Sequence, residues 1–219
     1  IYVEQEWTGY ERKNKNDMFH IKKQETLICL SLSSKLSGTY QSACLAKDMV
    51  DYENIYIVDT LTAAAGIRLL CEVAINWIGE NRCVEDIVSG LEELKERVHI
   101  YAGLDTLEYL AKGGRISKTA AAIGTLASIK PIICVDHGEV VVAGKTRGVN
   151  KATSVVCEKM QSDIVDTLYP VYTLYSYGLE NVEKLESKLD LDVNRVRIGS
   201  TIGVHIGPNA FGVCFVSKL

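Results

Sequence analysis

Short apolar runs alternate with amphipathic segments of helical length through the first half of this chain. The apolar runs cover residues 26–30, 55–58 and 98–104, and the helical segments cover residues 41–50, 62–79 and 84–97. Two parallel strands need a crossover connection of a dozen or more residues, which is usually a helix. The alternation therefore predicts an α/β fold in which the three runs are strands of a mostly parallel sheet.

The second half of the chain has a different pattern. Apolar runs at 131–135 and 139–143 flank Asp136, His137 and Gly138, which predicts a β-hairpin with glycine in its turn. Further helices are predicted at 150–161 and 180–189 and further strands at 171–177 and 212–216, and residues 195–198 begin a final section dense in glycine. Pro131 follows a stretch of small and apolar residues, 116–129, that we expect to be helical and to end before the proline. We therefore expect two lobes, residues 1–129 and 130–219, with a mixed α/β second lobe.

Composition excludes some classes of function. The 219 residues carry a net charge of −4, whereas nucleic-acid-binding domains usually have a basic surplus. No apolar run approaches the roughly 20 residues of a membrane-spanning helix. The seven cysteines are odd in number, scattered and without a C-x-x-C pair, which favours reduced thiols and a cytoplasmic location.

Hydroxyl side chains are concentrated between the first apolar run and the first predicted helix. Residues 33–39, which we call the serine turn, contain Ser33, Ser34, Ser37 and Thr39. Ligands of open α/β sheets bind at the carboxyl ends of strands, and the first turn of a helix offers unpaired N–H groups. This combination suits a carboxylate or a phosphate. The alternative is that Ser37 caps the helix and the other serines fill a turn.

A second candidate region lies near the C-terminus, where His205 is flanked by Gly203 and Gly207. The imidazole could donate a hydrogen bond to an anion or act as an acid or base, or it could be a structural histidine bonded to a carbonyl. Two basic loops, at 112–117 and 145–148, could bind a phosphate or a partner protein, although a solvated loop is the more general role of such a sequence.

Several familiar catalytic and cofactor motifs are missing. The sequence contains no G-x-x-x-x-G-K-[ST], no G-x-G-x-x-G, no G-x-S-x-G and no H-E-x-x-H. The four histidines show no metal-ligand spacing. We therefore expect neither a metal nor a cofactor.

Taken together and in order, the motifs resemble one family, the DegV-type fatty-acid-binding proteins. They are S-S-K-L-S-G-T-Y-Q-S-A at 33–43, L-E-Y-L-A-K-G-G-R-I-S at 107–117, K-P-I at 130–132, G-E at 138–139, K-T-R-G at 145–148 and I-G-V-H-I-G-P at 202–208. Each motif is weak alone, but the ordered set is specific and extends from about residue 25 to the end.

The resemblance implies a two-lobed α/β protein that buries one long-chain fatty acid between its lobes and is not itself an enzyme. In Gram-positive bacteria such proteins present the fatty acid to a separate fatty acid kinase, which makes the acyl phosphate. Carried over to this chain, Ser33, Ser34, His205 and Gly207 would bind the ligand. Arg147 would contact the kinase or, transiently, an anionic membrane surface. The pocket walls are expected from residues 120–123 and 211–215.

One departure from the family pattern concerns the N-terminus. The family has an N-terminal strand with an Asp-Ser pair and a later Thr-Ser-x-Pro stretch whose threonine also touches the carboxylate. Residues 1–25 contain neither. We therefore expect either that the first lobe is incomplete at its N-terminus or that the head-group site lacks one donor.

Two other functions stay open at this point. Ser33 or Ser34 with His205 could serve a serine esterase or acyltransferase, although no acid is placed to orient His205 and the serines are not in a nucleophile elbow. The chain could also be a lipid sensor or transport module without a kinase partner.

Overall fold

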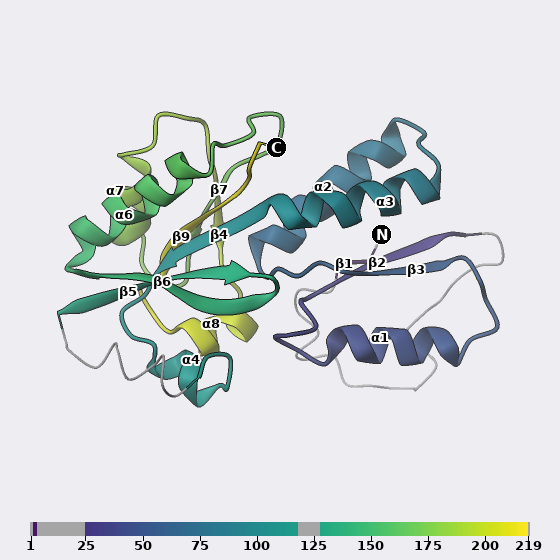
Figure 1. The fold of residues 1–219 in the computed structure, drawn as a ribbon, viewed down its shortest axis with the longest axis horizontal. Helices are drawn as coiled ribbons and strands as arrows, with labels where there is room; N and C mark the ends of the chain where they lie inside the picture. The colour runs from purple at the N-terminus through teal and green to yellow at the C-terminus, as the bar shows by residue number, and fades with distance from the viewer. Residues whose placement is uncertain (1, 4–24, 118–127, 219) are drawn as a thin grey trace.

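The computed structural model describes residues 2–3, 25–117 and 128–218, which form two lobes side by side (Figure 1). Each lobe is built on its own sheet, with strand orders β1-β2-β3 and β6-β5-β4-β9-β7-β8. The predicted pocket-wall residues 120–123 and most of the predicted helix at 116–129 lie outside the described residues.

The first sheet is parallel throughout, as predicted. It consists of β1 (Tyr2–Val3), β2 (Leu27–Ser31) and β3 (Ile55–Asp59), and β1 is a strand that the sequence pattern did not indicate. In Figure 1, α1 (Thr39–Asp48) lies below this sheet, and α2 (Ala65–Gly79) and α3 (Val84–Leu94) lie above it. The register pairs Ser31 with Asp59, so both strands end at the same edge, beside the serine turn.

The second sheet is mixed. Its strands are β4 (Val98–Gly103), β5 (Ile129–Asp136), β6 (Glu139–Arg147), β7 (Tyr172–Tyr175), β8 (Asn194–Arg197) and β9 (Phe211–Val216). The helices of this part are α4 (Glu108–Lys112), α6 (Val149–Ser162), α7 (Glu180–Glu186) and α8 (Ser200–Ile206), and a 3-10 turn at Lys95–Arg97 follows α3. Among the described strands of this second sheet, only β7 and β8 pair in parallel.

The predicted hairpin is confirmed, and it is longer than the pattern suggested. β5 pairs with β6 from Ile129 opposite Arg147 to Asp136 opposite Glu139. Its two turn residues, His137 and Gly138, have φ angles of 45° and 84°. Positive φ at both central residues matches the twist of the flanking strands, which is why glycine is favoured here.

The prediction for residues 98–104 is wrong in one respect. β4 is a strand, but it lies at the centre of the second sheet, antiparallel to β5 and β9, and not in the parallel sheet. The alternation of strands and helices shows that a strand is present but does not identify its partner. Pro131 lies within β5, opposite Lys145. The division of the chain at residues 129 and 130 stays a prediction.

Helix α2 joins the two sheets into one core. Its buried residues, among them Ile67, Leu70 and Ala74, belong to the same apolar cluster as Leu30 of β2 and Cys214 of β9. Helix α2 also makes a polar contact with the second sheet. Glu72 of α2 accepts a hydrogen bond from the hydroxyl of Tyr172 in β7, and it forms an ion pair with Arg68 at 2.7 Å. Burial and the carboxylate of Glu72 both raise the pKa of Tyr172.

The opposite face of the second sheet is covered by α6 and α7. Alternate residues of β9, Phe211, Val213 and Phe215, face these helices together with Val156 and Leu185. All six residues of β9 are buried because both faces of the sheet are covered. None of the helices in the described ranges has the length and apolar character needed to cross a bilayer.

Candidate functional site

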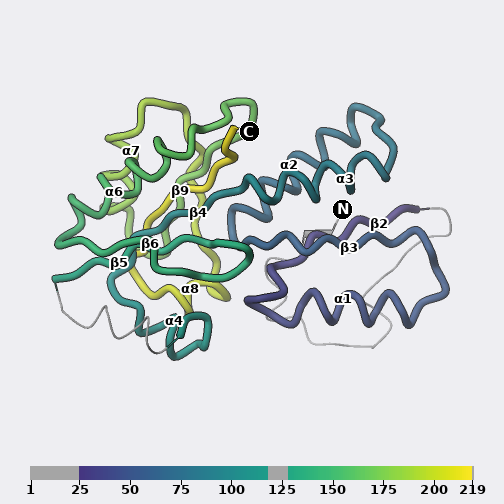
Figure 2. Tube along the Cα trace, in the orientation of Figure 1, coloured from purple at the N-terminus to yellow at the C-terminus, as the bar shows by residue number. Residues whose placement is uncertain are grey.

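The tip of the β5–β6 hairpin meets the serine turn at the waist between the two lobes (Figure 2). Ser33 is fully buried there, and its hydroxyl donates a hydrogen bond to the carbonyl of Gly138 at 2.7 Å. The same oxygen accepts a hydrogen bond from the N–H of Lys35 at 3.2 Å. The Ser33 hydroxyl therefore holds the hairpin tip against the serine turn.

Ser34 has a different environment. Its N–H donates to Oδ1 of Asp59 at 3.1 Å, and the same carboxylate oxygen accepts the N–H of Leu61 at 3.2 Å. The Ser34 hydroxyl forms no hydrogen bond with any described residue, and the side chain is only partly buried. Of the two predicted serines, Ser34 is thus the one whose hydroxyl is available to a ligand. Asp59, at the end of β3, positions it.

The alternative role for Ser37 as a helix cap is wrong. Gly38 is the residue at the N-cap of α1, and no side chain caps this helix. The hydroxyls of Ser37 and Thr39 instead bond to each other at 2.9 Å. The Ser37 hydroxyl also accepts the N–H of Thr39, the first residue of α1, at 3.4 Å, but from the position before the N-cap.

His205 lies in the last turn of α8, a helix that the glycine-rich sequence did not predict. Its Nδ1 is buried and has no hydrogen-bond partner among the described residues. The ring lies against Gly113, where an added Cβ would be only 2.1 Å from Nδ1. Burial lowers the pKa of His205, and the positive charge of Arg115 lowers it further. The imidazole is therefore neutral at pH 7, with a buried nitrogen open to a partner.

Arg115 connects the histidine to the serine turn. Its Nε donates to the carbonyl of Leu36 at 3.0 Å, and its Nη1 donates to the carbonyl of Gly113 at 2.5 Å. The sequence contained this residue in the basic loop at 112–117, for which a solvated role was the general expectation. Its glycine neighbours were the available signal, because glycine permits a close approach such as that of His205.

Gly207 and Arg147 are the other two residues to which the sequence assigned a role. Gly207 has a φ of 76°, and an added Cβ would lie 2.4 Å from the ring of Tyr109, so this glycine allows α8 to lie against α4. Arg147 is exposed at the end of β6. At about 3.3 Å per residue, the strand separates it from the hairpin tip by roughly 30 Å. The ligand-binding role of Gly207 and the partner role of Arg147 stay predictions.

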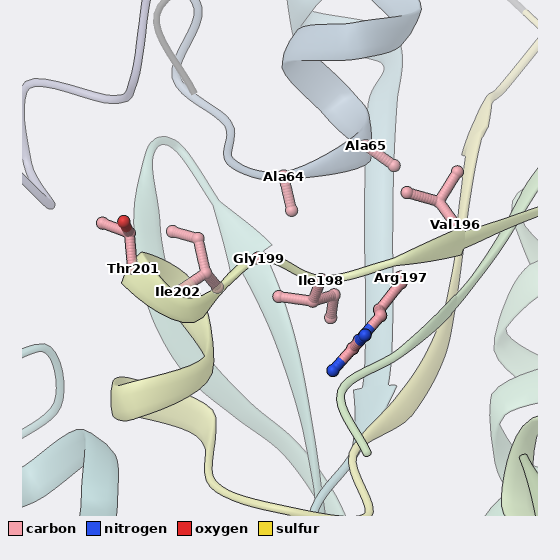
Figure 3. A pocket seen from close by; sticks show the side chains of 8 residues that line it. All are labelled: Ala64, Ala65, Val196, Arg197, Ile198, Gly199, Thr201 and Ile202. Carbon is pink, nitrogen blue, oxygen red and sulfur yellow. The ribbon is translucent and has the colours of Figure 1, made fainter. Parts of the chain in front are cut away.

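An apolar pocket opens between the start of α2 and the segment that leads from β8 into α8 (Figure 3). Ala64 and Ala65 project from the α2 side, and Val196, Ile198 and Ile202 project from the other. Ile202 is one helical turn before His205 in α8, about 4.5 Å along the helix axis. The lining is thus largely apolar, with Arg197 and Thr201 as its polar members, and it includes a residue of the helix that carries His205. Residues 211–215, the other predicted wall, are not among its lining.

Comparison with known proteins adds to this geometry. The family model described as "Uncharacterised protein, DegV family" matches residues 15–218. The chain belongs to the DegV family. A DegV domain-containing protein of Clostridium acetobutylicum is 35% identical over 211 residues, which are 94% of this chain and 76% of that relative.

Solved structures of DegV proteins share the fold of this one. The structure described as fatty acid binding of a DegV family protein from Thermus thermophilus is 29% identical with a TM-score of 0.79, and the match covers 88% of this chain and 71% of that one. The Fatty Acid Kinase (Fak) B3 protein of Streptococcus pneumoniae, loaded with linoleic acid, has a TM-score of 0.78 at 18% identity, covering 87% and 71%. The predicted two-lobed α/β fold is thereby confirmed.

The hydrogen bond between Ser33 and the hairpin tip leads to a testable prediction for this DegV protein. In Ser33→Ala the buried carbonyl of Gly138 loses its donor, and we expect the free energy of unfolding to fall by about 1–3 kcal/mol. Urea denaturation followed by circular dichroism measures the change. Ser34→Ala is the matched control and should unfold at the wild-type urea concentration. Equal losses in the two variants would contradict this division of roles.

Proposed function

We propose that this DegV protein binds one long-chain fatty acid between its lobes and presents the carboxylate to a separate fatty acid kinase without being an enzyme itself. The observation that carries the proposal is a largely apolar pocket lined in part by α8, the helix that also holds the buried, unpartnered Nδ1 of His205, in a family that includes fatty-acid-binding proteins. On this proposal Ser34 and His205 hold the carboxylate, and Ser33 holds the turn in shape.

The acyl chain would supply most of the affinity. A buried methylene contributes roughly 0.8 kcal/mol, so a tail of about fifteen offers on the order of 12 kcal/mol before the costs of ordering. Ala64, Ala65 and Ile198 would contact the tail, and Arg197 is the one charged residue in the lining. The polar groups would then decide which end of the molecule enters the site, because a carboxylate buried without donors is costly.

The head group suits a neutral imidazole next to an arginine. Nδ1 of His205 can carry a proton and donate it in a hydrogen bond to a carboxylate oxygen. A carboxylate beside the ring would raise the pKa of His205, which is the reverse of the effect of burial and of Arg115. Binding and the protonation state of His205 are therefore coupled.

Presentation to a kinase is supported by the shared fold of the pneumococcal Fatty Acid Kinase B3 protein. The carboxylate of the bound ligand would lie at the waist of the molecule, near the hairpin tip, where a second protein can approach it. Exposed Arg147, on the same hairpin, would contact that kinase or an anionic membrane surface. The site of action would be the cytoplasm, where acyl phosphates are made and used.

Native mass spectrometry of delipidated protein incubated with palmitate tests the proposal. We expect one palmitate per chain in the wild type and a loss of at least tenfold in affinity in Ser34→Ala/His205→Ala, because both head-group contacts are removed. Ser42→Ala, an exposed change on α1, is the matched control and should bind as the wild type does. NMR titration should show the pKa of His205 rising when palmitate binds.

The alternatives give different results in the same preparation. A protein that takes up no palmitate contradicts the proposal. Binding of palmitate without any acyl phosphate, when a fatty acid kinase and ATP are added, would favour the sensor function. Labelling of Ser33 or Ser34 by a serine-reactive phosphonate, with hydrolysis of a chromogenic ester, would indicate an enzyme.

A further inference from the structure

A second buried polar atom without a partner lies close to the serine turn. Thr62 is 2% exposed, and its Oγ1 forms no hydrogen bond with any described residue. Within the described ranges, Oγ1 of Thr62 and Nδ1 of His205 are the two buried side-chain atoms of this kind. Buried hydroxyls nearly always have a partner, so each exception calls for an explanation.

The other fully buried hydroxyls in the part of the chain that the structure describes have hydrogen-bond partners. Thr60 donates to the carbonyl of Ser31 at 2.7 Å, and Thr153 donates to the carbonyl of Asn150 at 2.9 Å. Thr173 donates to Glu186 at 2.6 Å, and Ser33 donates to Gly138. The missing partner of Thr62 is therefore a property of this position and not of buried hydroxyls in this chain generally.

Thr62 is connected to the serine turn and precedes a residue of the pocket. Its carbonyl accepts the N–H of Ser33 at 3.0 Å, which ties it to the serine turn. Two residues later, Ala64 lines the apolar pocket. The two unpartnered atoms thus belong to the two segments that line the pocket, Thr62 two residues before Ala64 and His205 one turn after Ile202.

The hydroxyl of Thr62 lies over the first turn of α2. A Cβ added to Gly66 would be only 2.2 Å from Oγ1, which places the oxygen against the start of this fifteen-residue helix. The first turn of a helix has N–H groups without intrahelical partners and the positive end of the dipole. No acidic side chain occupies the first turn of α2. These surroundings favour the binding of an anion near Oγ1 of Thr62.

We propose that Thr62 is a further head-group residue, whose hydroxyl donates a hydrogen bond to the carboxylate of the bound fatty acid at the start of α2. The inference rests on the proposed function and adds to it a donor from the loop between β3 and α2. It also explains why a threonine with no use for its hydroxyl in the fold is buried there. Gly66, which lies one turn on, leaves the room that this side chain needs.

The test uses Thr62→Val, which keeps the shape of the side chain and removes the hydroxyl. Its affinity for palmitate, measured by calorimetry on delipidated protein, should fall about tenfold, and its affinity for methyl palmitate should fall much less. The melting temperature without ligand should be unchanged or higher, because an unpartnered buried hydroxyl is replaced by a methyl group. Thr62→Ser should recover most of the affinity for palmitate.

Thr153→Val is the matched control, since it removes a buried hydroxyl of α6 that already has a partner. It should lower the melting temperature and leave the affinity for palmitate unchanged. An unchanged affinity for palmitate in Thr62→Val overturns the inference. So does a lowered melting temperature without ligand, which would show that the hydroxyl serves the fold. A wild-type protein that binds no palmitate contradicts the proposed function itself.

Discussion

The Gly113→Ala variant is expected to bind palmitate about tenfold to a hundredfold more weakly than the wild type while it keeps its fold. An alanine Cβ at this position would lie 2.1 Å from Nδ1 and 2.8 Å from Cε1 of His205, so the imidazole must move away. Gly113 has a φ of −75°, which alanine adopts without strain. The change therefore acts on the histidine rather than on the backbone.

A hydrogen bond to a charged group is worth about 1.5–3 kcal/mol, which corresponds to the expected loss. Calorimetry with delipidated protein measures it. Gly79→Ala is the matched control, because Gly79 also ends a helix and an added Cβ there meets nothing within 4 Å. If Gly113→Ala acts through His205, combining it with His205→Ala should cost no more than His205→Ala alone. Wild-type affinity in Gly113→Ala would refute the assignment of His205 to the ligand.

The largest loss of stability is expected from Gly212→Ala, at the centre of the second sheet. An added Cβ would lie 2.4 Å from the carbonyl oxygen of Tyr101 and 2.9 Å from Cβ of Ala102. Gly212 is paired with Ala102 of β4 on one side and with Leu174 of β7 on the other, so β9 cannot shift to make room. We expect the free energy of unfolding to fall by about 3 kcal/mol.

Gly144→Ala provides the control for this change. Gly144 is in β6 at the edge of the same sheet, and an added Cβ there would meet only Cβ of Ile132, at 3.9 Å. Its free energy of unfolding should stay within about 1 kcal/mol of the wild type. Urea denaturation of both variants gives the comparison. A Gly212→Ala protein as stable as Gly144→Ala would show that the sheet can widen at this point.

The residues around the proposed head-group site come from both lobes of the protein. Relatives that share this fold at 18–29% identity include proteins described as fatty-acid-binding. In the present chain, the groups around the proposed head-group site come from both lobes: Ser34, Asp59 and Thr62 from one, and Arg115 and His205 from beyond β4. A site assembled in this way depends on how the lobes meet, which α2 and the hairpin tip control.

Local features of the fold were predictable from the amino-acid sequence alone. The turn at His137 and Gly138 depends on two adjacent residues that accept positive φ. The strand, turn and helix around the serine turn follow from apolar periodicity within about twenty residues. The ordered motifs likewise indicated Ser34 and His205. In the turn and in the strand–turn–helix unit the determining residues are neighbours in the chain, whereas Ser34 and His205 were indicated by the order of the motifs along the whole chain.

Contacts between residues far apart in the chain became known from the folded structure. The partners of β4, the hydrogen bond of Ser33 with Gly138 across 105 residues and that of Arg115 with Leu36 across 79 residues are of this kind. The hydroxyl of Thr62 is recognisable as unpartnered only when all its neighbours are placed. A hydrogen bond forms only between groups that the fold brings within about 3 Å of each other. The residue types alone do not specify which distant groups the fold brings together.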